Sequence, residues 1–280
     1  MSLRVMTFNI AHSSVPNLLR RWEARRSHVT DVIRAARADV VCLQEVSERQ
    51  LLDLESDLTD FECFPGPPSG ATRLPSALGF AAPLLRAVLR DFMYSGERCP
   101  ILLRRERFRS LETGTADVLP LANVPSTGTP HLLNWVRAAD ARDGTRVVFF
   151  NTHLGLLPWR AREAARRLLT VIAREADGRL EVMTGDLNST PRGATLRTLL
   201  FDPATGEGRF HDAWRAARER CGPGWTFHAG LGLPGPRIDF VLVRPGTQVE
   251  RAEVIPGRVG STFPSDHCAL VVELEAAARS

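Results

Sequence analysis

Several short apolar segments of this 280-residue sequence begin or end in side chains that can bind a metal ion or transfer a proton. The apolar runs are rich in β-branched and aromatic residues, which predicts buried strands. The end of a strand fixes a side chain in place while leaving it open to a cleft. The polar residues at these positions are Asn9, Glu45, His153, Asp186, Asn188, Asp239, Asp266 and His267.

These residue types suit the hydrolysis of phosphate esters. Carboxylate and amide oxygens are ligands for Mg²⁺ or Mn²⁺, so Glu45 and Asp266 are candidate metal ligands. Asn9 and Asp186 are expected close by. The two histidines of the set can act as acids or bases near neutral pH. A divalent ion neutralises phosphoryl charge, while an aspartate or a histidine activates water.

Taken singly, most of these side chains also have a purely structural explanation. Asn9 could bond to a turn of the backbone, and His153 could be a hydrogen-bonded core histidine. Asp239 differs, because it lies in an apolar strand where a buried carboxylate needs a partner. Asp239 and Glu97 could each orient a histidine, and the sequence leaves open which histidine Asp239 serves. So many strand-end polar residues in one chain favour a shared site.

The elements expected to position these residues are buried strands, amphipathic helices and hairpins. Two packed sheets with helices outside would accommodate them, and no linker is long enough to divide the chain. One domain over residues 1–280 is therefore expected, with a hairpin turn at residues 142–144. Strands are predicted at 3–8, 40–43, 77–82, 99–104, 107–119, 132–140, 146–152, 180–184, 225–228, 237–243, 248–255 and 267–274. Helices are predicted at 17–37, 47–58 with Ser47 as N-cap, 158–176, 193–201 and 210–219.

The composition is that of a globular protein, with 44% hydrophobic and 24% charged residues. Its basic residues number 36, and all are arginine because the sequence contains no lysine. Schiff-base catalysis and a lysine-dependent phosphate loop are thereby excluded. The net charge of +4 is spread along the chain and is weak support for nucleic-acid binding.

The cysteines and the N-terminal residues indicate the cellular compartment of the protein. Five cysteines, an odd number without metal-binding spacing, predict free thiols in a reducing environment. The N-terminal residues contain no apolar core of a signal peptide, and no stretch is long and apolar enough for a transmembrane segment. A cytoplasmic protein is expected, with no obligate protein partner.

Six short motifs, taken in order, resemble those of the endonuclease/exonuclease/phosphatase superfamily, which has the DNase I-like fold. The resemblance runs from residue 3 to about 274 and is strongest to small bacterial metal-dependent hydrolases of that group. It implies an α/β fold, a four-layer αββα sandwich of two mostly antiparallel or mixed sheets. The motifs are Thr7-Phe8-Asn9, Leu43-Gln44-Glu45, Asn151-Thr152-His153-Leu154, Gly185-Asp186-Leu187-Asn188, Arg237-Ile238-Asp239-Phe240 and Ser265-Asp266-His267.

The resemblance also implies roles for the polar residues. Glu45 corresponds to the main metal ligand, with Asn9 beside it, and Asp266 closes the metal site. Asp186 and Asn188 correspond to the pair that positions the attacking water and a phosphate oxygen.

The two histidines and their neighbours receive roles from the same resemblance. His267 contacts the phosphate or takes a proton, and His153 matches the second histidine of the DNase and sphingomyelinase branches. Asp239 buttresses a histidine, and Glu97 resembles the glutamate that supports the other one. Arg137 stands where relatives have a phosphate-facing arginine.

These implied roles predict a Mg²⁺- or Mn²⁺-dependent phosphoesterase, in the first place a phosphodiesterase that uses metal-activated water. The alternatives are a nuclease acting on DNA or RNA, a lipid or inositol phosphatase or sphingomyelinase-like enzyme, and a non-catalytic binding module. The substrate is a phosphate ester: nucleic acid, a nucleotide or a phospholipid head group. Gly155-Leu156-Leu157 replaces the Asp that many relatives carry, which weakens a sphingomyelinase assignment. Cys99-Pro100 replaces their Asn-Ala, which weakens the match to the family at Glu97.

Overall fold

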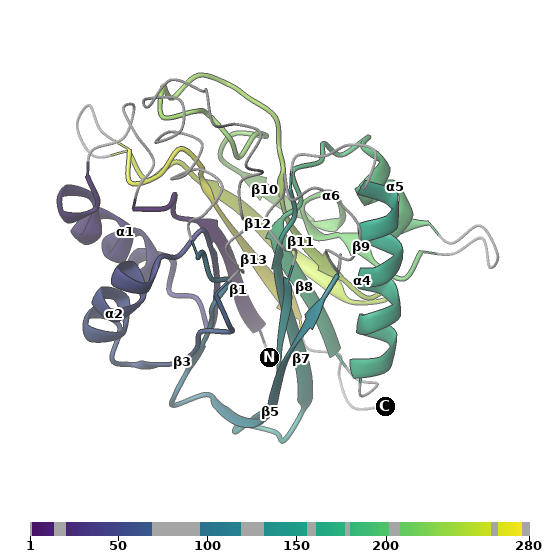
Figure 1. Ribbon diagram of the computed structural model, residues 1–280. Coiled ribbons are helices and arrows are strands. Elements are labelled where there is room, and N and C mark those ends of the chain that lie inside the picture. The colour runs from purple at the N-terminus through teal and green to yellow at the C-terminus, as the bar shows by residue number, and fades with distance from the viewer. Residues whose placement is uncertain are drawn as a thin grey trace, which may run out of the picture.

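Two β-sheets lie face to face, and helices cover the outer side of each, so the molecule has four layers (Figure 1). The computed structural model describes residues 2–13, 21–68, 96–118, 132–155, 161–176, 180–201, 208–258 and 263–275. This arrangement confirms the αββα sandwich expected from the sequence.

The first sheet is mixed. Its described strands, in spatial order, are β10 (Glu219–Cys221), β12 (Gln248–Ile255), β13 (Ala269–Glu275), β1 (Ser2–Asn9), β2 (Val40–Gln44), β4 (Ile101–Arg104) and β3 (Phe61–Phe64). At its centre, β1 runs parallel to β2 and antiparallel to β13.

The second sheet is also mixed. Its described strands, in spatial order, are β5 (Phe108–Asp117), β6 (Leu132–Asp140), β7 (Arg146–His153), β8 (Leu180–Asp186), β11 (Asp239–Val243) and β9 (His211–Asp212). Here β7 runs parallel to β8, and β11 runs antiparallel to β8. The expected hairpin joins β6 to β7, and Gly144 adopts a φ of 74° in its turn.

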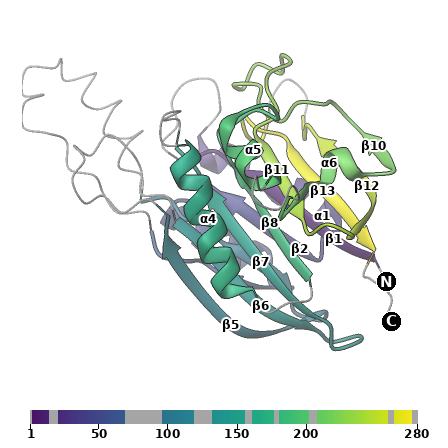
Figure 2. The same cartoon turned by 90° about the vertical axis from the view of Figure 1, so that its right-hand side faces the viewer.

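The helices form the two outer layers. α1 (Trp22–Ala36) and α2 (Glu48–Asp57) pack on the first sheet, while α4 (Ala161–Glu175) and α5 (Ala194–Leu200) pack on the second. Figure 2 shows α4 lying along the outer face of β7 and β8. Within the part of the chain that the structure describes, no helix has both the length and the apolar character to cross a membrane.

Burial on both faces explains why the central strands read as continuous apolar runs. In β1, Val5 packs between the two sheets, whereas Met6 packs beneath α1 and α2. In β11, Val241 packs between the sheets and Phe240 faces α4 and α5. Successive side chains point to opposite faces, so a strand covered on both sides is apolar throughout.

Strand register brings the polar strand ends together at one end of the sandwich. Asn9 lies opposite Gln44 in the first sheet, and Asp186 lies opposite both His153 and Asp239 in the second. The two sheets are joined there by a hydrogen bond of 2.7 Å from Gln44 Nε2 to Asn151 Oδ1.

Most predicted elements match, and the misses have a tertiary cause. Ser47 is the N-cap of α2, as predicted, and it forms a capping box with Gln50. The helix expected at 210–219 shrinks to one turn, α6 (Ala213–Ala216), because the flanking residues pair into β9 and β10 instead. The strand expected at 225–228 is only a single bridge between Phe227 and His267. The strand β3 was not predicted. The predicted strand 77–82 and the first residues of the helices predicted at 17–37 and 158–176 lie outside the described residues.

Arg107 joins the two sheets at the end opposite those polar residues. Its side chain is 2% exposed and forms ion pairs with Asp39, beside β2, and with Asp140, the last residue of β6. It also donates a hydrogen bond of 2.9 Å to the carbonyl of Ser2. A guanidinium can serve three acceptors at once because its donors form a planar fork.

Replacing Arg107 by methionine is expected to lower the free energy of unfolding by about 3–5 kcal/mol, because two carboxylates would lose their buried partner. Urea unfolding followed by circular dichroism measures the loss. The control is Arg209→Met, which leaves Glu181 paired with Arg244 and is expected to cost less than about 1 kcal/mol. Equal losses in the two variants would contradict the assignment.

Candidate active site

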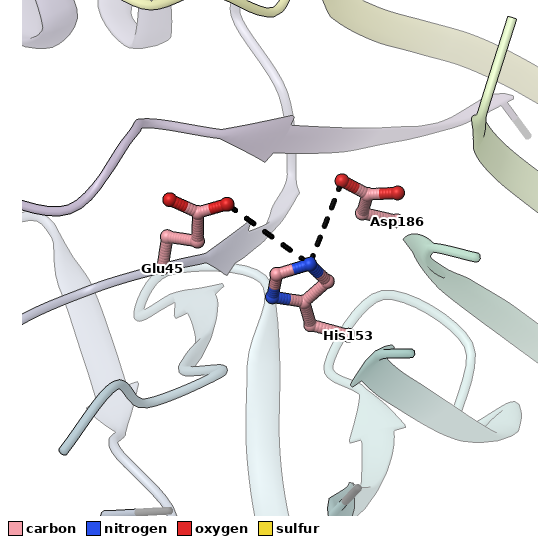
Figure 3. Close-up of side chains that lie close together, drawn as sticks. All are labelled: Glu45, His153 and Asp186. Carbon is pink, nitrogen blue, oxygen red and sulfur yellow. Dashed lines mark ion pairs between the residues drawn. The ribbon is translucent and has the colours of Figure 1, made fainter. Parts of the chain in front are cut away.

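Asp186 lies at the centre of a cluster of ionisable side chains. It ends β8, is 1% exposed, and faces two imidazoles. Its Oδ2 is 3.7 Å from Nε2 of His153 and 3.6 Å from Nε2 of His267. Figure 3 shows the ring of His153 between the carboxylates of Asp186 and Glu45. The cluster therefore takes residues from both sheets.

The surroundings of Asp186 raise the pKa of its carboxyl group. Burial, followed by the nearby Asp239 carboxylate, raises the pKa of Asp186 to about 6, although His267 and His153 favour its charged form. Its Oδ1 accepts a hydrogen bond of 2.9 Å from the backbone N–H of Asn188. Asn188 has a φ of 44°, a left-handed conformation that short polar residues tolerate in such turns.

Each histidine is paired with its own carboxylate. Nδ1 of His267 lies 2.9 Å from Oδ2 of Asp239, and Nδ1 of His153 lies 3.1 Å from Oε1 of Glu97. The sequence left open which histidine Asp239 orients, and in the structure Asp239 is paired with His267. Both pairs use Nδ1, so both histidines turn Nε2 toward Asp186.

These pairings favour the protonated imidazoles. Burial by itself lowers the pKa of His267, but the carboxylates of Asp239 and Asp186 outweigh it and raise the pKa to about 10. For His153, burial is likewise outweighed by Glu97 and Asp186, which raise its pKa well above the usual range. An imidazolium at Nε2 is a hydrogen-bond donor suited to an anionic phosphate oxygen.

Glu45 follows β2 and reaches the same cluster from the first sheet. Its φ of 59° is a left-handed conformation that costs free energy and that functional sites often retain. Its Oε1 lies 4.0 Å from Nε2 of His153 (Figure 3). Its Oε2 accepts a hydrogen bond of 3.1 Å from the backbone N–H of His12.

Asn9 bridges two carboxylates. Its Nδ2 donates to Oε1 of Glu45 at 2.9 Å and to Oδ2 of Asp186 at 3.1 Å. Its Oδ1 accepts from the backbone N–H of Ala11 at 3.0 Å. The amide is thus oriented with its donor toward the carboxylates, so in this arrangement Asn9 aligns Glu45 and Asp186 and does not offer its oxygen to the cluster.

Asp266 lies near Glu45 at the start of the segment that leads into β13. Burial and the Glu45 carboxylate raise the pKa of Asp266, while His267 opposes the change. The hydroxyl of Ser265 is 3.3 Å from Oδ1 of Asp266 and 2.6 Å from the carbonyl of Asn9. Asp266 is therefore tied to the end of β1, at the edge of the cluster.

The donor atoms in this cluster fit a divalent cation. Two groups have ligand atoms within 4.8 Å of one another: Glu45, His153 and Asp186, and Asp186, Asp239 and His267. Oδ1 of Asp239 is buried without a hydrogen-bond partner among the described residues. Clustered carboxylates with an unsatisfied oxygen suit a hard ion such as Mg²⁺ or Mn²⁺.

The motif Thr226-Phe227-His228, within the strand predicted at 225–228, was not among the residues expected in the site, yet it supports the Asp239–His267 pair. The hydroxyl of Thr226 accepts hydrogen bonds of 3.1 Å from the backbone N–H groups of Ile238 and Asp239. The ring of Phe227 lies 5.0 Å from that of His267. These residues therefore hold the Asp239–His267 pair, and the only sequence signal was the motif itself.

Arg137, the arginine expected to face the phosphate, lies elsewhere, and so does Arg98. Arg137 projects from β6 and pairs with Glu112 on β5 and with Glu175 at the end of α4. Arg98 pairs with Glu48. Arg137 lies opposite Val148, which is five residues before His153 on β7, so the structure does not bring it to the cluster. Strand register and the carboxylates of Glu112 and Glu175 direct the guanidinium away from the place expected for it.

Most of the chain matches the sequence model of one known family. The family model for the endonuclease/exonuclease/phosphatase family matches residues 6–267. A comparison with curated proteins finds no match.

Solved structures share the fold. A family protein of Bacteroides vulgatus has 24% identity and a TM-score of 0.81, covering 99% of this chain and 100% of that one. The mannosyl-6-phosphatase of Bacteroides thetaiotaomicron has 21% identity and a TM-score of 0.77, with coverage of 98% and 99%. TDP2 of D. rerio in complex with a single-strand DNA product has 17% identity and a TM-score of 0.67, with coverage of 98% and 99%.

At these identities the solved structures establish the likeness in fold alone, whereas the family model spans most of the sequence. The chain belongs to the endonuclease/exonuclease/phosphatase family.

Proposed function

We propose that this protein is a Mg²⁺- or Mn²⁺-dependent phosphoesterase that hydrolyses phosphodiesters. The observation that carries the proposal is the placement of Asp186, which faces two carboxylate-paired histidines and lies beside Glu45. That combination supplies both anionic oxygens for a cation and cationic donors for a phosphate.

In this proposal Glu45 and Asp186 hold the ion, with Asp266 at its edge and Asn9 aligning the first two. The ion, when bound, neutralises phosphoryl charge and lowers the pKa of its water. Asp186 and Asn188 orient the attacking water, and Asp186 accepts its proton.

The two histidines act on the phosphate in different places. His267, oriented by Asp239, donates from Nε2 to a non-bridging phosphate oxygen. His153, oriented by Glu97, donates from Nε2 toward the leaving oxygen. Each Nδ1 is committed to a carboxylate, so Nε2 is the atom that faces Asp186 and the proposed substrate position.

Hydrolysis of bis-p-nitrophenyl phosphate by the purified chain tests the proposal. We expect activity with Mg²⁺ or Mn²⁺ and loss of that activity in EDTA, with recovery when the ion is returned. Activity that survives exhaustive chelation, or none with either ion, would contradict it. Parallel assays with p-nitrophenyl phosphate, oligonucleotides and phospholipid head-group esters assign the substrate class. Two relatives, one named as a sugar phosphatase and one bound to a DNA product, make both monoesters and nucleic acids worth including.

Replacing Arg137 by alanine is expected to leave kcat/KM for the phosphodiester within about twofold of the wild-type value, because this side chain lies outside the cluster. Steady-state kinetics measure it, with Arg146→Ala as an exposed control on the same sheet. A loss of kcat/KM above about tenfold would show that Arg137 contributes to the substrate site.

We also infer that residues 1–280 act as one unit, because the cluster needs side chains from both sheets. All five cysteines are free thiols, which supports the expectation of a reducing, cytoplasmic compartment.

A further inference from the structure

Arg25 is a buried arginine at the end of the sandwich that holds the candidate site. It lies on α1 and is 2% exposed. Its guanidinium donates to the carbonyls of Ile10 at 2.8 Å, Ala11 at 3.0 Å and Pro264. One side chain therefore binds two backbone segments that are far apart in the sequence.

Both segments carry residues of the proposed metal site. Ile10 and Ala11 directly follow Asn9, and Pro264 precedes Asp266 by two residues. Burial lowers the pKa of Arg25 to about 10, and the carboxylates of Asp266 and Glu45 counteract that effect. The guanidinium thus lies close enough to both anionic groups to interact with them electrostatically.

The segment after β1 needs this support. Ala11 has a φ of 55°, a left-handed conformation that costs about 1–2 kcal/mol for a residue other than glycine. Its carbonyl accepts from Arg25 and also from Nε2 of Gln50 at 3.0 Å. Strained backbone persists only where its surroundings hold it, and here two side chains do so.

We propose that Arg25 is a positioning residue for the metal, because it clamps the segment after Asn9 to the segment before Asp266. It thereby sets the distance between Asp266 and Glu45, whose carboxylate is held by Asn9 and by the backbone N–H of His12. The inference rests on the proposed metal-dependent function. Three carbonyls on two segments match the planar fork of an arginine, whereas a lysine ammonium is a compact point charge at the end of a flexible stem. Residues that orient metal ligands typically change metal affinity by about 10- to 100-fold when removed.

Arg107 provides a matched control. It is equally buried, and it also binds backbone and carboxylates on both sheets, but at the opposite end of the sandwich. A purely structural role for Arg25 would make variants at the two positions alike: less stable, with unchanged metal affinity.

The test measures Mn²⁺ binding to the metal-free full chain by isothermal titration calorimetry, with Arg25→Lys, Arg25→Gln and Arg107→Lys compared below their melting temperatures. We expect Mn²⁺ affinity to fall by at least about tenfold in Arg25→Gln and by an intermediate factor in Arg25→Lys, while Arg107→Lys stays within about twofold of wild type. At saturating Mn²⁺, kcat of Arg25→Lys should recover more fully than its Mn²⁺ affinity. Should Arg25→Gln fail to fold, Arg25→Lys decides alone.

The outcomes separate the two proposals. Wild-type Mn²⁺ affinity in the folded Arg25 variants, or equal losses at Arg25 and Arg107, would overturn the positioning role and leave the metal-dependent function standing. Absence of Mn²⁺ and Mg²⁺ binding in the wild-type chain would overturn both.

Discussion

Replacing Asp186 by asparagine is expected to lower kcat/KM for phosphodiester hydrolysis by at least about 10³-fold, without a comparable loss of stability. The change keeps the shape of the side chain and removes the charge that faces His153, His267 and the proposed ion. It also removes the group proposed to accept the proton of the attacking water. A single oxygen of Asp186, Oδ2, lies within 3.7 Å of Nε2 of both histidines.

Steady-state kinetics at saturating Mn²⁺, together with thermal unfolding, measure this effect. The control is Asp140→Asn, which alters a buried carboxylate at the opposite end of the same sheet. Asp140→Asn should lower the melting temperature and leave kcat nearly unchanged. If Asp186→Asn retains more than a tenth of wild-type activity, the central role of Asp186 is wrong.

Replacing Asp239 by asparagine is expected to lower kcat by about 10²- to 10⁴-fold, the range for loss of a positioned acid–base group. Asp239 is fully buried, and its Oδ2 accepts from Nδ1 of His267 at 2.9 Å. An amide in its place carries no charge to stabilise the imidazolium, so His267 would be neutral, with its Nδ1–H donating to the amide oxygen and its Nε2 unprotonated. His267 would then present an acceptor where the phosphate requires a donor.

Glu97→Gln is the matched change in the other pair and should cost less, about 10- to 100-fold. His153 keeps other anionic neighbours, because its Nε2 lies 3.7 Å from Oδ2 of Asp186 and 4.0 Å from Oε1 of Glu45. Kinetics of both variants with bis-p-nitrophenyl phosphate and with an ester of a poorer leaving group separate the two roles. The Glu97 variant should suffer more with the poorer leaving group, and the reverse ranking would exchange the roles of His153 and His267.

The structure explains the use of arginine in place of lysine at a few positions. Arg25 and Arg107 each bind three acceptors from distant segments, and Arg237 pairs with Asp212 through two nitrogens. These sites use the planar fork, which a lysine cannot reproduce. The surface arginines do not require it, so composition alone could not identify the few that matter.

The sequence by itself determined the order of strands and helices in the core and most members of the candidate site. Continuous apolar runs such as β1 and β11 are readable because burial on both faces leaves no polar positions. Strand-end residues such as Glu45 and Asp186 were identified because polar side chains directly after such runs are conspicuous. The start of α2 at Ser47 was predictable for a similar reason, because the capping box of Ser47 and Gln50 is a local interaction.

Tertiary structure alone decided the pairings. That Asp239 serves His267, that Arg137 turns to Glu112 and Glu175, and that residues 219–221 form β10 all depend on register between strands distant in sequence. The clamp by Arg25 has the same origin, since Ala11 and Pro264 meet only after β1 has paired with β13. Local sequence encodes the propensity and burial of each segment, but a side chain's partner is set by which segments pack together, and that is a property of the folded chain.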